Sequence, residues 1–175
     1  MSSFKLISTS LRGDWLPRID FVVDYPVEEV WPLIVRWDRW VLDKRVTHIG
    51  GEADQLGAIK KVADFKDGVE GAYFILQIVR LIPNVRMVSR TLPIPEPYEG
   101  FQVFRGYAIF NLFSLGDRRT LVSYETTCEC ESSLMTEEKM GTVIGIKAEE
   151  DSVPHWEAHY IPALKKLLAE GRPKK

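Results

Sequence analysis

The sequence predicts an α+β protein in which a series of antiparallel strands is followed by one long C-terminal helix. Three observations support this prediction. Residues 45–131 consist of β-rich runs separated by turn or loop sequences. A short pattern of apolar residues at helical spacing precedes these runs, and a longer one follows them. Helices that are separated from the strands along the chain pack on one face or at one end of the sheet.

The first strand and the first helix are predicted on either side of Pro26. "RIDFVVDY" (18–25) is rich in β-branched and aromatic residues, and Pro26 ends this strand because proline cannot donate a ladder hydrogen bond. Glu28 and Glu29 then stand in the first turn of a helix, where the helix dipole favours acidic side chains. Unless the helix begins near Glu29, Pro32 is expected to kink it. The apolar face of this helix is formed by Val27, Val30, Trp31 and Ile34.

Three of the five tryptophans lie close together in "WPLIVRWDRW" (31–40). The segment 37–43 is predicted to form a second short helix at an angle to the first. A tryptophan side chain can bury roughly 150–250 Å², which is more than a surface helix needs. Trp31 is expected to face the sheet, whereas Trp37 and Trp40 are expected where the short helices meet the end of the sheet. These rings either fill a core or line a ligand pocket, and the two roles are compatible.

Six further strands are predicted between residues 45 and 131. Their boundaries are marked by turn residues, among them Gly50-Gly51, Asp67-Gly68 and Pro83-Asn84. The last strand, "TLVSYETTCECE", alternates strictly, which indicates one wet face and one buried face. The predicted strands cover residues 45–50, 58–65, 72–82, 86–92, 101–115 and 120–131.

The C-terminal helix is predicted from Thr136, which can act as an N-cap, to about Glu170. Gly171 is expected to end it, and Pro154 and Pro162 are expected to bend it. A strongly curved sheet cannot close its own concave face, so we expect this helix to lie across it. The apolar stripe of the helix is formed by Val153, Trp156, Tyr160, Leu164, Leu167 and Leu168.

The chain of 175 residues fits a single domain, predicted at residues 18–175 after an irregular N-terminal segment, 1–17. Its formal net charge is −2, and acidic and basic residues are mixed along the chain, which gives no argument for binding nucleic acid. No apolar run approaches the roughly 18–20 residues that span a bilayer, and no signal-peptide core is evident. We therefore expect a cytoplasmic protein.

The sequence offers little support for a metal site. Cys128 and Cys130 fall on one face of their predicted strand, which is poor geometry for a disulfide between them, and they are interpreted as reduced core residues. His155 and His159 stand at i and i+4 on the C-terminal helix and have the spacing of a zinc-binding pair. No third ligand is evident and Glu157 does not fit the H-E-x-x-H pattern, so neither a metal nor another cofactor is predicted.

The order of these elements, together with three stretches of sequence, resembles the SRPBCC superfamily, the START or Bet v 1-like helix-grip proteins, and within it the polyketide cyclase/dehydrase type. The stretches are "VEEVWPLIVRWDRW" (27–40), "QIVRLIPNVRMVSR" (77–90) and "GDRRTLVSYE" (116–125). The resemblance implies a helix-grip fold, with a curved antiparallel sheet of about seven strands wrapped on the C-terminal helix and a deep apolar cavity between them. It carries no catalytic residue to this chain, because the superfamily shares none.

The expected pocket residues come from both halves of the chain. Tyr124 and Thr126 lie on the buried side of the last strand, where a hydroxyl must find a partner in the protein, in water or in a ligand. One of His155 and His159 is a candidate proton shuttle, because histidine titrates near neutral pH. The proline-rich loop 93–100 is expected either as a rigid crossover or as a gate at the cavity entrance. The full set of expected cavity-lining residues is Trp37, Trp40, Tyr98, Phe101, Tyr107, Tyr124, Thr126, Trp156, His159 and Tyr160.

Two functions are expected from such a cavity. The first is the binding of a hydrophobic, ring-containing small molecule or lipid. The alternative is a cyclase, dehydratase or isomerase that acts without a metal on a polyketide-like or other apolar substrate through general acid/base groups. A third function, with less support, is partner binding through the helix surface, and a homodimer also stays open. No nucleophile motif or phosphate-binding loop is found, so the sequence does not decide whether the protein is catalytic.

Overall fold

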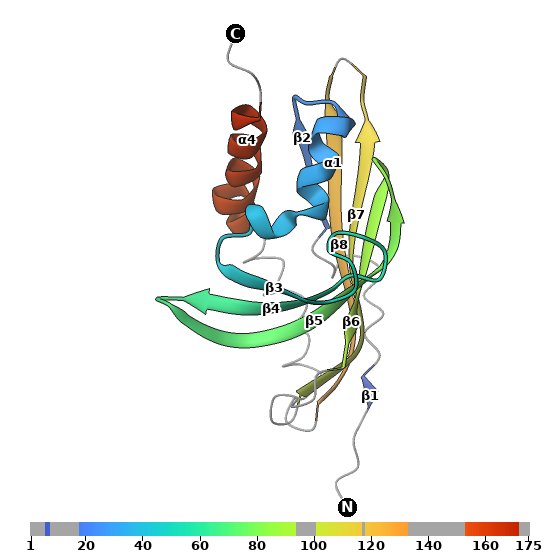
Figure 1. Cartoon of the computed structure of the whole chain (residues 1–175), viewed down its shortest axis with the longest axis vertical. Helices are drawn as coiled ribbons and strands as arrows, with labels where there is room; N and C mark the ends of the chain where they lie inside the picture. The colour runs from blue at the N-terminus through green and yellow to red at the C-terminus, as the bar shows by residue number, and fades with distance from the viewer. Residues whose placement is uncertain (1–5, 8–17, 94–100, 117, 133–152, 172–175) are drawn as a thin grey trace, which may run out of the picture.

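The computed structural model shows a strongly curved sheet with helices gathered over one end of it (Figure 1). The described residues are 6–7, 18–93, 101–116, 118–132 and 153–171. For residues 6–7, 66, 72, 101–105 and 127–132 the description is limited to the backbone.

One antiparallel sheet of eight strands forms the body of the protein. Its order is β1-β8-β7-β6-β5-β4-β3, and β2 also pairs with β8. The predicted curved antiparallel sheet is confirmed, and β1 is a two-residue strand within the segment that was expected to be irregular. The strands span Leu6–Ile7 (β1), Arg18–Val23 (β2), Lys44–Gly50 (β3), Ile59–Lys66 (β4), Val69–Ile82 (β5), Arg86–Leu92 (β6), Phe101–Ser114 (β7) and Thr120–Ser132 (β8).

Two helical segments follow β2, as predicted. Helix α1 spans Val27–Val35 and contains Pro32, and η1 is one 3-10 turn at Trp37–Arg39. The prediction of a helix over residues 37–43 is therefore wrong beyond Arg39.

Tertiary hydrogen bonds explain why the second helix ends so early. The indole Nε1 of Trp40 donates a hydrogen bond to the carbonyl oxygen of Leu33 at 2.8 Å, which fixes the ring against α1. The amide of Phe65 donates to the carbonyl oxygen of Asp43 at 3.0 Å, which joins the chain to β4. The chain after Arg39 is thereby held by α1 and β4 rather than by a continuing helix.

The C-terminal helix contains a widened turn. Its described part begins at Val153, passes through the π turn η3 (Trp156–Tyr160) and continues as α4 (Ile161–Glu170). Pro162 has no N–H, and its ring crowds the carbonyl four residues earlier, which a π turn relieves. Part of the predicted helix, 136–152, lies outside the described residues. Within the part of the chain that the structure describes, no helix is long and apolar enough to cross a membrane.

The main core lies where these helices meet the sheet. Helices α1 and α4 lie side by side, and α1 also contacts β7 (Figure 1). Burial of large side chains at this end stabilises the fold, because about 25 cal/mol is gained for each Å² of apolar surface removed from water. Its fully buried members include Val23, Val30, Ile34, Trp40, Val122 and Leu164.

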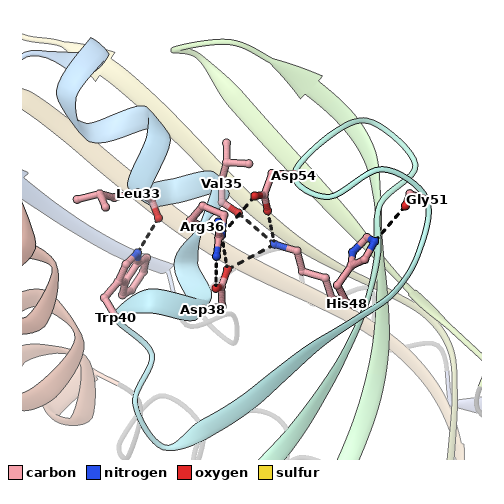
Figure 2. Close-up of polar contacts among 9 residues, drawn as sticks. Leu33, Val35, Arg36, Asp38, Trp40, His48, Gly51 and Asp54 are labelled. Atoms are coloured by element: carbon pink, nitrogen blue, oxygen red, sulfur yellow. Dashed lines mark hydrogen bonds and ion pairs between the residues drawn. The ribbon is translucent and has the colours of Figure 1, made fainter.

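A cluster of four charges ties α1, η1 and the connection before β4 together (Figure 2). The side chain of Lys60 is only 6% exposed, and its Nζ lies 3.0 Å from Asp54 Oδ1. The same Nζ lies 3.6 Å from Asp38 Oδ1 and 3.2 Å from the Val35 carbonyl oxygen. Arg36 completes the cluster, at 3.3 Å from Asp38 and 3.2 Å from Asp54. Two cations face two carboxylates, so the buried charge of Lys60 is compensated within the protein.

Candidate ligand-binding site

A group of aromatic rings joins the π turn to the sheet, and Trp156 stands at its centre. The ring of Tyr124 on β8 stacks on Trp156 with 4.7 Å between centroids and an angle of 28°. Trp40 meets Trp156 edge-on at 5.7 Å, and Tyr160 meets it edge-on at 5.2 Å. Phe110 on β7 lies 4.7 Å from Tyr124. We call these five residues the aromatic cluster.

The aromatic cluster fills the space between the π turn and the sheet. Trp40, Trp156 and Tyr160 are buried, with 0%, 7% and 8% of their surface exposed. Trp40 is therefore a core residue, and Trp37 packs against the core while partly accessible. Tyr124 is the tyrosine of the cluster that lies on the sheet and stays partly accessible.

The side chains of β7 that face the helices become smaller toward the middle of the sheet. Leu112 and Phe110 are buried in the core, and the next positions on the same face are Ala108 and Gly106. The register with β8 is regular from residue 105 onward, so the alternation of faces holds over this stretch. These two side chains fill less of the space above the sheet than Leu112 and Phe110 do.

Hydroxyl-bearing residues flank Ala108 on the two neighbouring strands. Ala108 pairs with Ser89 on β6 and with Thr126 on β8. Thr126 lies on the same face as Tyr124, as predicted from the alternation of β8, and both are partly accessible. We call the surface formed by Gly106, Ala108, Thr126 and Tyr124 the sheet floor.

Tyr124 lies between the aromatic cluster and the sheet floor. Burial raises the pKa of its phenol well above the ordinary value of 10.0. Part of the residue is nevertheless accessible, and its hydroxyl forms no hydrogen bond within the described residues. The hydroxyl is also not one of the buried, unpartnered atoms, which among the described residues are Arg86 Nε and His155 Nε2. The phenol is thus held deep in the protein while part of the residue stays accessible.

Asp43 brings a carboxylate to the rim of the aromatic cluster. Its Oδ1 accepts a hydrogen bond from the hydroxyl of Tyr160, and its Oδ2 lies 3.4 Å from His155 Nε2. Burial, this hydrogen bond and the charge of Asp43 raise the pKa of Tyr160. His159 is exposed, and its ring lies 4.7 Å from that of His155. Asp43, His155, His159 and Tyr160 form a polar rim that includes groups suited to proton transfer.

Of the remaining predicted site residues, Tyr107 does not join this arrangement. Tyr107 lies on the opposite face of β7 from Phe110, and it pairs with Arg90 of β6 on that face. Arg90 there donates a hydrogen bond to Gln77 at 3.1 Å. Tyr98 lies outside the described residues, and of Phe101 only the backbone is described.

Sequence reasoning missed Asp43 and the small residues of the sheet floor. Asp43 was placed inside a predicted helix, so nothing in the local pattern indicated contact with Tyr160, which lies 117 residues away in the chain. Ala108 and Gly106 could have been found, since they are the smallest residues of their face in an otherwise bulky strand. Small residues on the inner face of a curved strand are a usable signal for a hollow.

A metal-binding group and a surface groove are two other kinds of site that a protein can offer. The described residues contain no group of three or more His, Cys, Asp or Glu side chains that could hold a metal ion. A groove of about 390 Å³ lies between α1 and the end of α4. Glu29, Arg39 and Glu170 contribute to its lining, so it is more polar than the sheet floor and is separate from it.

Structure comparison finds proteins of the same fold along most of the chain. A START superfamily protein from Mycobacterium smegmatis is 12% identical, with a TM-score of 0.61 over 89% of this chain and 98% of its own. Ara h 8.0201 is 10% identical, with a TM-score of 0.60 over 89% and 98%. DynU16, from the dynemicin biosynthetic locus, is 19% identical, with a TM-score of 0.56 over 93% of this chain and 49% of its own. Neither a protein-family model nor a curated protein matches the sequence.

Proposed function

We propose that this chain, whose helix-grip fold is shared with the START superfamily protein and Ara h 8.0201, binds a hydrophobic, ring-containing small molecule on the sheet floor. The ligand would lie on Ala108 and Gly106, with one edge against the exposed side of Tyr124. Apolar surface and a few placed polar groups are the usual composition of a small-molecule site. A lipid or a polyketide-like ring system has the required chemistry.

The observation that carries this proposal is the environment of Tyr124. Its ring is held by Phe110 and Trp156 at 4.7 Å each, so it is fixed in position before any ligand arrives. Its hydroxyl forms no hydrogen bond within the described residues and keeps accessible surface. A rigid aromatic face with a free polar tip is suited to orient a ring compound.

A fluorescent, uncharged dye such as N-phenylnaphthylamine tests the proposal. We expect saturable one-to-one binding to the wild-type protein, with enhanced dye fluorescence. Ala108→Leu adds bulk to the sheet floor and should weaken binding at least about tenfold, because the added side chain occupies the ligand's place. Asn111→Leu, on the opposite face of β7, is the matched control and should leave binding unchanged. Binding that Ala108→Leu does not weaken would place the ligand elsewhere.

A second candidate function is favoured by the polar rim. Asp43 contacts both the hydroxyl of Tyr160 and the imidazole of His155, and this is a set of groups that can move a proton. A bound ketone or polyketide-like substrate near this rim could undergo enolisation, dehydration or cyclisation without a metal. DynU16, which belongs to a biosynthetic locus, is compatible with this alternative.

The two functions are distinguished by following the bound molecule over time. Native mass spectrometry of the protein purified from its own host identifies a co-purified ligand by mass. Recovery of that ligand unchanged after prolonged incubation supports binding alone. Conversion that Asp43→Asn slows by at least about 100-fold supports catalysis, since general acid/base groups contribute factors of this order.

The location and the partners of the protein are also part of this proposal. A cytoplasmic location is part of the proposal, and the absence of a nucleic-acid partner is expected from a net charge of −2 with mixed acids and bases. A homodimer stays a proposal, which light scattering on the purified protein would test. Neither function requires a cofactor.

A further inference from the structure

Two tyrosine hydroxyls lie where a ligand on the sheet floor would meet the aromatic cluster, and they differ in what they can donate. Tyr124 presents a hydroxyl that is not engaged by any described residue. Tyr160 belongs to the same aromatic cluster, and the rings of both tyrosines contact Trp156. Tyr160 already donates its proton to Asp43. Of the two phenols, therefore, the one with a proton left to donate is Tyr124.

The formal charge next to these hydroxyls is negative. The carboxylate of Asp43 contacts Tyr160 directly, and its own side chain is 43% exposed toward the rim. Lys60 on β4 is already paired with two carboxylates, those of Asp54 and Asp38. Lys60 is the one buried cation among the side chains that the structure describes. An anionic ligand on the sheet floor would thus approach a carboxylate and find the described buried cation already compensated.

We propose that the site selects an uncharged ring compound that carries a hydrogen-bond acceptor, such as a ketone or quinone oxygen, and that the Tyr124 hydroxyl donates to this oxygen. The ring lies on Ala108 and Gly106, and the oxygen points toward the edge of the aromatic cluster. The corresponding carboxylate is disfavoured by Asp43. This inference rests on the proposed function and assigns Tyr124 as the residue that sets ligand specificity.

The chemistry of a buried phenol supports this assignment. Burial raises the pKa of Tyr124, so the residue remains a neutral donor throughout the physiological pH range. The Tyr124 hydroxyl has no hydrogen-bond partner within the described residues, so a ligand that supplies an acceptor gains a hydrogen bond without breaking one to them. A hydrocarbon of the same shape gains the apolar contact only.

Three compounds with one ring system test the proposal: naphthalene, acetonaphthone and naphthoate. Their dissociation constants are measured by calorimetry at neutral pH against the wild-type protein, Tyr124→Phe and Tyr107→Phe. We expect the ketone to bind the wild type about fivefold tighter than the hydrocarbon, which corresponds to one net hydrogen bond, and the carboxylate to bind most weakly. Tyr124→Phe should remove the advantage of the ketone. Tyr107→Phe, on the opposite face of β7, should keep it.

The outcomes separate this inference from the function on which it depends. If the hydrocarbon and the ketone bind but Tyr124→Phe leaves their ratio unchanged, the specificity assignment is wrong and the binding function stands. If naphthoate binds most tightly, the charge argument is overturned. If none of the three compounds nor the neutral dye binds, the proposed function itself fails. Tyr124→Phe removes no hydrogen bond to a described residue and keeps the ring, so its fold should be retained.

Discussion

At the scale of single residues, Tyr124 and Tyr160 make the stability of the protein depend on pH in the alkaline range. Their pKa values are raised above the ordinary 10.0, so the folded protein keeps both phenols protonated at a pH where the unfolded chain ionises them. Stability is therefore complete below pH 10 and is lost as pH rises toward the folded-state pKa values. We expect the free energy of unfolding in urea to fall above pH 10.

The variants Tyr124→Phe and Tyr160→Phe isolate the contribution of these two residues. Each should make the decline of stability above pH 10 shallower than in the wild type, because one phenol fewer ionises on unfolding. Lysines also lose protons in this pH range, but their effect on stability is common to all three proteins and cancels in the comparison. Parallel declines in wild type and both variants would contradict the burial of these phenols.

Asp54 provides a second test at this scale. Asp54→Asn keeps a side chain that tolerates the φ of 61° at this position but removes the negative charge nearest to the buried Lys60. We expect a loss of about 2 kcal/mol in the free energy of unfolding, less than for a fully buried pair because Asp54 is partly accessible. Asp20→Asn, which removes an exposed charge paired with Arg18, should cost less than about 1 kcal/mol. Equal losses in urea unfolding would show that the cluster adds nothing beyond a surface ion pair.

The sequence alone could separate Tyr124 from Tyr107 only in part. The strict alternation of β8 placed Tyr124 on its buried face, and it packs against the core as expected. In β7 both faces carry apolar residues, for example Ile109 on one and Phe110 on the other. Alternation therefore could not decide whether the face of β7 that carries Tyr107 points inward. Only the pairing with neighbouring strands decides this.

At the scale of elements, the connection between β3 and β4 depends on a glycine. Gly51 has a φ of 73°, and a Cβ atom there would lie 2.7 Å from the carbonyl oxygen of Gly57. We expect Gly51→Ala to lower the free energy of unfolding by about 3 kcal/mol, from backbone strain plus the clash. Gly68→Ala has a similar φ of 82° but open space around the Cβ, and it should cost only about 1 kcal/mol. Similar losses in chemical denaturation would show that the contact is relieved cheaply.

The elements that sequence predicted well are those with strong local signals. The strand runs rich in β-branched residues were placed within a few residues of their observed bounds. The segment 37–43 failed because Trp40 and Asp43 obey tertiary hydrogen bonds rather than helical spacing. The effect of Pro162 was predicted as a bend, and the structure shows a π turn directly before it, which accommodates the proline ring.

At the scale of the whole molecule, a ligand should stabilise the folded protein in proportion to its free concentration. An uncharged ring ketone at 100 times its dissociation constant should add about 2.7 kcal/mol, because it binds only the folded state. Thermal unfolding followed by calorimetry should show a melting temperature that rises with ligand concentration. Ala108→Leu, if it binds tenfold more weakly, should gain only about 1.4 kcal/mol at the same ligand concentration, and a shift equal to that of the wild type would refute the sheet floor as the site.

The fold was more predictable than the site for a physical reason. A fold is fixed by many apolar contacts along the chain, so errors at single residues average out. The site depends on a few contacts between distant segments, such as Asp43 with Tyr160, and these have no periodic signal. The resemblance to helix-grip proteins therefore gave the curved sheet and the C-terminal helix but not the polar rim.

Strand β3 forms the border of the sheet in the described structure, since its one partner there is β4. Its outward backbone groups could template another strand, which is the first step of fibril growth. Lys44 and Arg45 place positive charge along this border, and the register is irregular between His48 and Gly50. An incoming chain would have to desolvate these cations and follow a broken ladder. The border is thereby protected against amyloid stacking while staying open to water.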